Sequence, residues 1–235
     1  MPPTAPPPTA AIDALFGEWD RPDSPGCALG IIRRGALIYA RGYGAANLEY
    51  DLPIGPAAVF HVASVSKQFT AAAIVLLAQD GALGLDDDLR QHLPELPDLG
   101  RPISIRQALQ HVGGLRDQWD LLQLAGWRAA DLKTNADVLD LATRQRALNF
   151  APGAEWLYSN TGYTLAALSV ERVSGQTLRA FLHERLFAPL GMARTHFHDD
   201  HAEVVPGRAY AYVPRDGGGY RISIPDFDTV GATSL

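Results

Sequence analysis

Residues 64–78 read Ser64-Val-Ser-Lys-Gln-Phe-Thr-Ala-Ala-Ala-Ile-Val-Leu-Leu-Ala78, a polar start followed by a largely apolar run. A run that is apolar on every side of a helical wheel is typical of a buried helix rather than of an amphipathic surface helix. Asp80-Gly81 then supplies a helix stop. The sequence therefore predicts a buried helix that begins with Ser64 and Lys67.

The spacing of Ser64 and Lys67 allows their side chains to interact. Residues three apart lie on one helix face, so the amino group of Lys67 can reach Oγ of Ser64. A serine hydroxyl attacks an ester or amide when a base takes its proton, and burial lowers the pKa of a lysine towards that of a useful base. Only two of the 20 basic residues are lysines, Lys67 and Lys133, and arginine stays protonated. The pair predicts a nucleophile and its base, although a Ser-x-x-Lys quartet also arises by chance about once in a chain of this size.

A second group of candidate residues follows the turn at Pro152-Gly153, where a short extended run leads to a helix expected from about Thr164. Alternation along an extended run would point Tyr158 and Asn160 to the same side. A phenol beside an ammonium group can share its proton, and a carboxamide can bind a substrate amide without charge. The alternative from spacing alone is a core tyrosine followed by an asparagine that caps a helix.

Taken together, these segments resemble the class C β-lactamase and D-alanyl-D-alanine carboxypeptidase superfamily of penicillin-binding-protein-like enzymes, which includes β-lactamase-like esterases. The resemblance runs from about residue 11 to the end of the chain. Val112-Gly113 departs from it, since the family usually has Thr-Ser there. The stretches that carry the resemblance are 60–77, 80–88, 93–97, 103–115, 152–163, 171–175 and 187–195.

The resemblance implies an α+β fold of the β-lactamase/transpeptidase type, with a helical region and an antiparallel sheet. It implies that Ser64 is the acylated nucleophile, that Lys67 and Tyr158 transfer protons, and that Asn160 binds the acyl amide of a small ester or amide substrate. It implies no cofactor.

The family's third motif, Lys/His-x-Gly on a later strand, has no match. We therefore expect a truncated chain in which the C-terminal strands and the C-terminal helix of the sheet are missing. The open sheet edge would favour self-association or complementation by the missing segment. The alternative from another functional class is a catalytically impaired homologue that acts as a binding module.

Along the chain we expect four segments: a disordered Pro-rich tail at 1–10, a helix and β-hairpin at 11–60, a mainly helical region at 61–203, and a hairpin with the start of the truncated part at 204–235. The first hairpin pairs 27–33 with 36–43 through Arg34-Gly35. The other expected elements are helices near 11–19, 105–110, 136–144, 164–174 and 178–187, and strands at 207–213 and 220–224.

The charge and composition exclude several classes of partner. A net charge of −6 without a basic run argues against nucleic acid, and no apolar run is long enough to span a membrane. The first ten residues lack the pattern of an export signal, so a cytoplasmic location is expected over a periplasmic one. A cytoplasmic esterase is the leading expectation, while β-lactams and D-amino-acid peptides stay open as substrates.

His196-Phe-His-Asp-Asp-His201 has the His-x-His-x-Asp-His pattern of zinc hydrolases with the metallo-β-lactamase fold. That fold needs further histidine ligands downstream, and His201 is the last histidine of the chain. We therefore expect no catalytic metal, with adventitious surface binding as the alternative. His111 has no motif partner and is expected to be structural or solvated.

Overall fold

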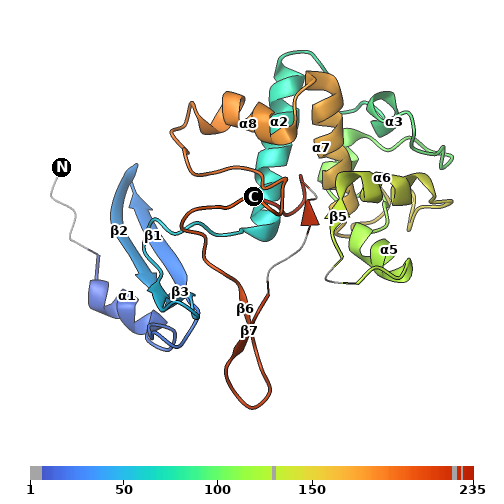
Figure 1. Ribbon diagram of the computed structural model, residues 1–235. Coiled ribbons are helices and arrows are strands. Elements are labelled where there is room, and N and C mark those ends of the chain that lie inside the picture. Colours follow the sequence, from blue (N-terminus) through green and yellow to red (C-terminus); the bar gives the residue numbers. More distant parts are fainter. Residues whose placement is uncertain (1–6, 129–130, 224–226, 229) are drawn as a thin grey trace. The chain divides into compact units, whose positions relative to one another are not determined.

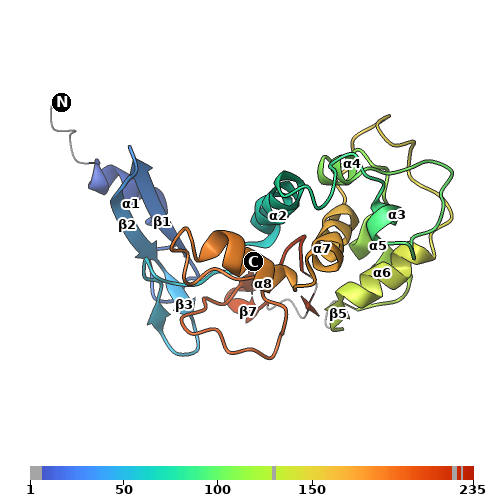
Figure 2. The same ribbon diagram turned by 90° about the horizontal axis from the view of Figure 1, so that it is seen from above.

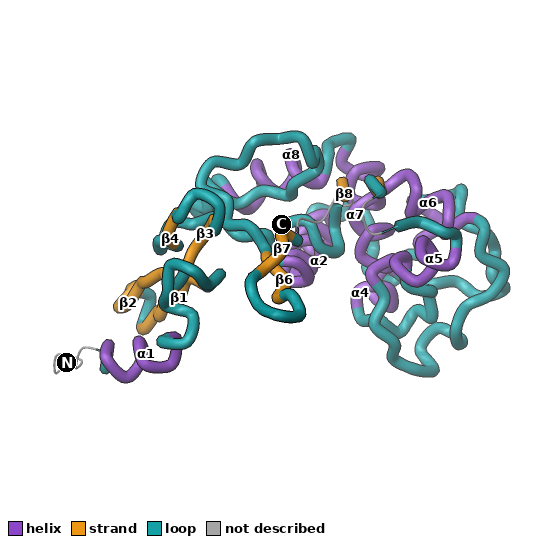
Figure 3. The backbone as a smooth tube through the Cα atoms, turned by 60° about the horizontal axis from the view of Figure 1, so that its bottom comes forward, coloured by secondary structure: helices purple, strands orange, loops and turns teal. Residues whose placement is uncertain are grey.

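The computed structural model describes residues 7–128, 131–223, 227–228 and 230–235. It divides into two compact units, each built from two stretches of the chain. The first unit takes Met1–His61 and Val204–Ile224, and the second takes Val62–Glu203 and Pro225–Leu235. Figure 3 shows that helices make up most of the second unit, while the first is richer in strands. The four consecutive segments expected from the sequence stay a prediction. They do not include the pairing of distant stretches that the two units show.

The first unit begins with helix α1 (Thr9–Phe16) and the antiparallel pair β1 (Cys27–Arg33) and β2 (Ala36–Tyr43) (Figure 1). Arg34 and Gly35 both have positive φ, 54° and 77°, as a two-residue type I′ turn requires. The predicted hairpin is confirmed. The helix starts at Thr9, directly after Pro8, so the expected tail ends earlier than residue 10; residues 1–6 lie outside the described part.

The rest of the first unit contains β3 (Ala45–Asn47) paired with β4 (Leu52–Pro53), and β6 (Tyr212–Pro214) paired with β7 (Tyr220–Ile222). The second hairpin is shorter than predicted, and Ile224 of the expected strand falls outside the described residues. A small apolar cluster of Ala46, Ile54 and Ala209 joins the two stretches of this unit.

Helices dominate the second unit, with α2 (Lys67–Gln79) and α7 (Asn160–Ser174) side by side at its centre (Figures 1 and 2). Strand β5 (Lys133–Thr134) pairs in parallel with β8 (Phe227–Asp228). The helical elements in chain order are η1 (Ala63–Ser66), α2 (Lys67–Gln79), α3 (Leu89–His92), α4 (Ile105–Leu109), α5 (Gln118–Leu124), α6 (Asn135–Thr143), α7 (Asn160–Ser174), α8 (Leu178–Leu182) and the π-helical turn η2 (His183–Phe187).

The core of this unit forms where small and branched side chains of α2 and α7 pack closely. Ala73 and Ile74 of α2 and Leu165 of α7 are fully buried. The prediction that α2 is buried on every side is wrong, however, because Val75 is 42 % exposed. Gly162 lets α7 approach α4, since a Cβ there would lie 2.9 Å from the carbonyl oxygen of Ala108.

Residues 230–235 form a buried segment that lies along α2 and α7. Thr70 Oγ1 donates to the carbonyl oxygen of Gly231 at 2.7 Å, and the Leu235 N–H donates to Ser66 Oγ at 2.9 Å. Gly231 has a φ of 101°, and a Cβ there would lie 2.6 Å from the carbonyl oxygen of Tyr163. Only glycine fits this position without displacing α7.

None of the helices formed by the described residues combines the length and apolarity that a membrane span requires.

The packing of α7 gives a stability prediction with a matched control. Leu165 is 0 % exposed, whereas Leu124 at the end of α5 is 85 % exposed. Leu165→Ala should lower the free energy of unfolding by about 2–5 kcal/mol, because it leaves a cavity in the core. Leu124→Ala should change it by less than about 0.5 kcal/mol. Urea unfolding followed by circular dichroism measures both, and equal losses in the two variants would contradict this description of the core.

Candidate active site

Ser64 lies in the 3₁₀ turn η1, directly after a residue with unusual backbone geometry. Ala63 has a φ of +48°, which is rare for a residue with a Cβ and costs on the order of 1 kcal/mol. The turn exposes Ser64 and then lets the chain enter α2 at Lys67, which is only 7 % exposed. The sequence predicted that the helix begins at Ser64, but the α-helix starts three residues later.

The side chain of Lys67 makes three polar contacts inside the second unit. Its Nζ lies 3.2 Å from Ser64 Oγ, 2.8 Å from Asn160 Oδ1 and 2.8 Å from the carbonyl oxygen of Ala232. A neutral amine has two N–H bonds and one lone pair. The two carbonyl oxygens can accept both N–H bonds, which leaves the lone pair to face the hydroxyl of Ser64. The arrangement thus suits Lys67 as a proton acceptor.

The surroundings of Lys67 contain groups that lower its pKa and groups that raise it. Burial lowers the pKa of the ammonium group below its usual value, because the charged form loses hydration. The nearby Tyr158 side chain and the negative charge of Asp117 raise the pKa of Lys67 and so oppose this shift. The net direction is downward, as a general base at neutral pH requires.

Tyr158 reaches Ser64 from a second side. Its Oη lies 2.7 Å from Ser64 Oγ, and its ring centroid lies 4.7 Å from Lys67 Nζ. Tyr158 is 39 % exposed. Ser64 Oγ therefore has two groups within reach that can exchange protons with it.

Asn160 is buried, but it does not lie in an extended run as predicted. It is the first residue of α7, and Ser159 before it is extended. The helix starts four residues earlier than expected because Asp117 caps it from elsewhere in the chain: Asp117 Oδ2 accepts from the Asn160 backbone N–H at 2.6 Å. The structure still brings Ser64, Lys67, Tyr158 and Asn160 together, as the sequence suggested.

Asp117 is a site residue that sequence reasoning missed. Its Oδ2 also accepts from Asn160 Nδ2 at 2.8 Å, so the carboxamide is turned with Oδ1 towards Lys67. Its Oδ1 caps α5 by accepting from the Trp119 N–H at 2.9 Å. An Asp before Gln118 and Trp119 is a recognisable N-cap signal, but the second set of hydrogen bonds has no local signature.

His111 is the second residue that the sequence did not assign. Its Nδ1 accepts from the Ser159 N–H at 3.2 Å, and its ring lies 4.5 Å from that of Tyr158 between centroids. Burial and the charge of Lys67 lower the pKa of His111, which favours the neutral ring with the proton on Nε2. His111 thus supports the position of Tyr158.

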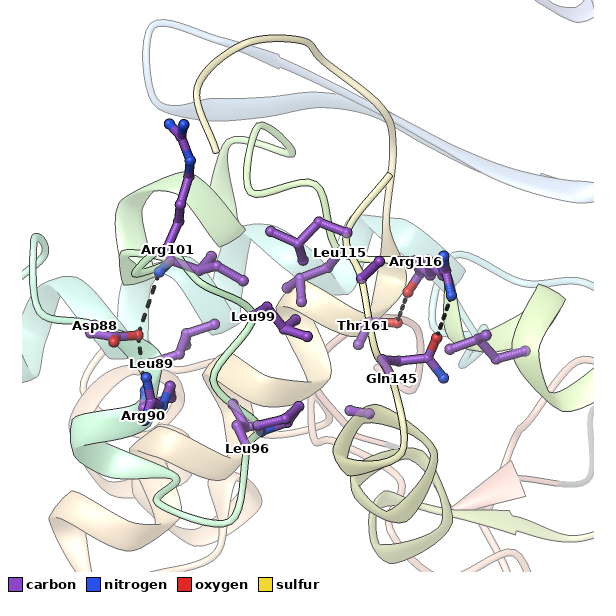
Figure 4. Close-up of a pocket in the computed structure, with 16 residues that line it drawn as sticks. Asp88, Leu89, Arg90, Leu96, Leu99, Arg101, Leu115, Arg116, Gln145 and Thr161 are labelled. Carbon is purple, nitrogen blue, oxygen red and sulfur yellow. Dashed lines mark hydrogen bonds between the residues drawn. The ribbon is translucent and has the colours of Figure 1, made fainter. Parts of the chain in front are cut away.

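A separate cavity lies beside the start of α7 and is shown in Figure 4. Leu89, Leu96, Leu99 and Leu115 line it, and Thr161 Oγ1 closes one side by donating to the carbonyl oxygen of Arg116 at 2.7 Å. Its volume is about 30 Å³, room for about two water molecules. The cavity is too small for an ester or peptide substrate, and Ser64 is not among its lining residues.

The family described as Beta-lactamase matches residues 12–228, nearly the whole chain. The chain belongs to the beta-lactamase family. It is 34 % identical over 182 residues to "Penicillin-binding protein 4*" of Bacillus subtilis (strain 168), which covers 76 % of this chain and 40 % of that protein. It is 30 % identical over 215 residues to a "D-aminopeptidase" of Cereibacter sphaeroides, and the match covers 88 % of this chain and 40 % of that protein. The chain thus spans 40 % of the length of these relatives.

The solved structure of the octameric penicillin-binding protein homologue from Pyrococcus abyssi is similar to this chain, with a TM-score of 0.85 and 24 % identity. The likeness covers 97 % of this chain and 53 % of that chain. It confirms the predicted α+β fold of the beta-lactamase family, and the family match confirms the resemblance seen in the sequence.

The hydrogen bonds of Asp117 generate a prediction for the site. Asp117→Ala leaves the Asn160 N–H, the Asn160 carboxamide and the Trp119 N–H without their acceptor. We expect it to lower the free energy of unfolding by about 2–4 kcal/mol. Asp120→Ala, an exposed position in the first turn of α5, is the control and should cost less than about 1 kcal/mol. Chemical denaturation measures both, and a loss at position 117 no larger than at 120 would contradict the assigned role.

Proposed function

We propose that the chain carries the acylation site of a serine hydrolase that acts on small esters or amides. One observation carries the proposal: Ser64 Oγ lies within 3.2 Å of Lys67 Nζ and 2.7 Å from Tyr158 Oη. Membership of the beta-lactamase family and the names of the two bacterial relatives support it.

In the proposed first step, Lys67 in its neutral form takes the proton of Ser64 while Oγ attacks the substrate carbonyl carbon. The Ser64 backbone N–H, at the positive start of the η1–α2 helix, donates to the developing oxyanion. The bond to the leaving group breaks, and Tyr158 Oη supplies the proton that the leaving alcohol or amine needs. Lys67 returns a proton to Tyr158, so the acyl-enzyme forms with both bases restored.

In the second step, water attacks the acyl group on Ser64. Lys67 and Tyr158 take the proton from this water and return one to Ser64 Oγ, which reverses the first step with water in place of the alcohol or amine. The acid product leaves and the free hydroxyl of Ser64 is restored.

Asn160 is proposed to bind the acyl part of the substrate. One N–H of its carboxamide donates to Asp117, and Oδ1 is occupied by Lys67. The other N–H is directed by these two contacts and can donate to a carbonyl oxygen of the substrate. Asp117 therefore acts as a positioning residue for Asn160.

The names of the relatives favour amide substrates, whereas the leading expectation from the sequence was a carboxylic ester. Both share the carbonyl chemistry that the site supports. A comparison of three chromogenic substrates decides between them: a short-chain nitrophenyl ester, a D-alanine nitroanilide and a cephalosporin. Ring opening of the cephalosporin without ester turnover would overturn the ester expectation.

Formation of an acyl-enzyme on Ser64 is the direct test of the proposed function. Intact mass spectrometry after exposure to nitrophenyl acetate should show one added acetyl group that maps to the Ser64 peptide. The Ser64→Ala chain, shown by circular dichroism to be folded, should lack this adduct. A penicillin tests the same serine with a different acyl donor. Equal labelling of the variant would contradict Ser64 as the nucleophile. The absence of both an adduct and turnover with any acyl donor in the folded chain would favour the binding-module alternative.

The pH dependence of acylation follows from the pKa of Lys67. The acylation rate should rise with pH as Lys67 loses its proton, with a midpoint below the ordinary lysine value of about 10.4 because burial disfavours the ammonium form. Asp117→Asn removes a negative charge that stabilises this ammonium, so its midpoint should move to lower pH.

Asp120→Asn serves as the control for this measurement and should leave the midpoint unchanged. Stopped-flow measurement of nitrophenol release between pH 5 and about 10.5 gives both profiles. A shift of the Asp117→Asn midpoint to higher pH would contradict the electrostatic assignment.

A further inference from the structure

Two histidines and a glutamate gather in the segment that follows η2, outside the proposed active site. His196 and His198 flank Phe197, which is fully buried and anchors the segment to the core. Alternation along this extended stretch places both imidazoles on one side, with ring centroids 5.9 Å apart. One potential ligand atom from each of His196, His198 and Glu203 lies within 4.8 Å of the others.

These side chains have the atoms that bind a transition metal. His198 Nδ1 lies 3.8 Å from Glu203 Oε2. His196 Nε2 is buried and has no hydrogen-bond partner among the described residues. Leaving such a nitrogen unpaired costs free energy, and coordination to a metal ion would remove that cost. Two imidazoles and a carboxylate form a donor set that suits Zn²⁺, with water as a fourth ligand.

The charges around the cluster also allow a cation. Arg179 of α8 binds Glu203 through both carboxylate oxygens, at 2.6 and 2.8 Å, and binds Asp199 at 2.8 Å. Two carboxylates thus face one guanidinium, which leaves a net negative charge. Arg179 fixes the carboxylate of Glu203 from one side, as outer partners of metal ligands commonly do. Its positive charge opposes a cation, so the site should bind more weakly than a closed structural zinc site.

We propose that His196, His198 and Glu203 form a binding site for a divalent transition metal ion such as Zn²⁺. Metal–ligand bonds of about 2.0–2.2 Å require the ligand atoms to move together by about an ångström. The ion does not take part in the proposed serine chemistry. Its role is structural: the backbone N–H of His198 donates to the carbonyl oxygen of Ser234 at 2.7 Å, in the segment that also supplies the Ala232 carbonyl oxygen to Lys67.

Zinc titration of the metal-free chain tests the site directly. Isothermal titration calorimetry should give one bound Zn²⁺ per chain, and the same ion should raise the melting temperature. His196→Ala and His198→Ala should each weaken binding at least tenfold, and Glu203→Gln should weaken it without changing side-chain volume. His183→Ala is the matched control, because His183 is exposed in η2 and should bind no metal of its own. Equal affinity in His196→Ala and His183→Ala would overturn the proposal.

Cobalt provides a second readout that needs no variant. Four-coordinate Co²⁺ bound by two imidazoles and a carboxylate gives intense visible absorption bands, whereas a hydrated ion on a surface histidine gives weak ones. We expect intense bands at one equivalent of Co²⁺, displaced by Zn²⁺. Weak bands that grow without saturation would mean adventitious binding only and would overturn the proposal even if the histidine variants fail to fold.

Discussion

The buried amino group of Lys67 is the interaction on which the rest of the site depends. A buried amine must be hydrogen-bonded, because an unpaired or isolated charged group in the interior is costly. Its three hydrogen-bond partners come from three separate stretches of the chain: Ser64 in η1, Asn160 at the start of α7 and Ala232 near residue 235. Each stretch has to adopt its observed conformation for the amine to be satisfied. The requirement links the geometry of the nucleophile to the packing of the whole helical unit.

The local parts of the fold could be predicted from the sequence because their signals are local. The β1–β2 hairpin follows from two strand-like runs around Arg34-Gly35, and α2 follows from an apolar run with a clear end. The start of α7 could not be predicted, since its cap is a carboxylate 43 residues earlier in the chain. Nor could the division into two units, since it depends on contacts between residues 45–60 and 204–214.

The same distinction explains which site residues were found. Ser64, Lys67, Tyr158 and Asn160 carry side chains whose chemistry is recognisable at a fixed spacing, and the structure brings them together. Ala232 acts through its backbone carbonyl oxygen, which every residue possesses, so no residue type could mark it. Asp117 and His111 look like an ordinary N-cap and an isolated histidine until the fold places them beside Asn160 and Tyr158.

The left-handed backbone of Ala63 has a consequence for engineering. Glycine adopts this conformation without strain, so Ala63→Gly is an obvious candidate when the aim is tolerance to heat. The same change would give the peptide before the nucleophile more conformations to sample, and Ser64 would spend less time at the position where Lys67 and Tyr158 meet it. Stability against unfolding and correct positioning of the Ser64 hydroxyl therefore favour different residues at position 63. A directed-evolution experiment that selects for stability should favour glycine there, and one that selects for activity should favour alanine.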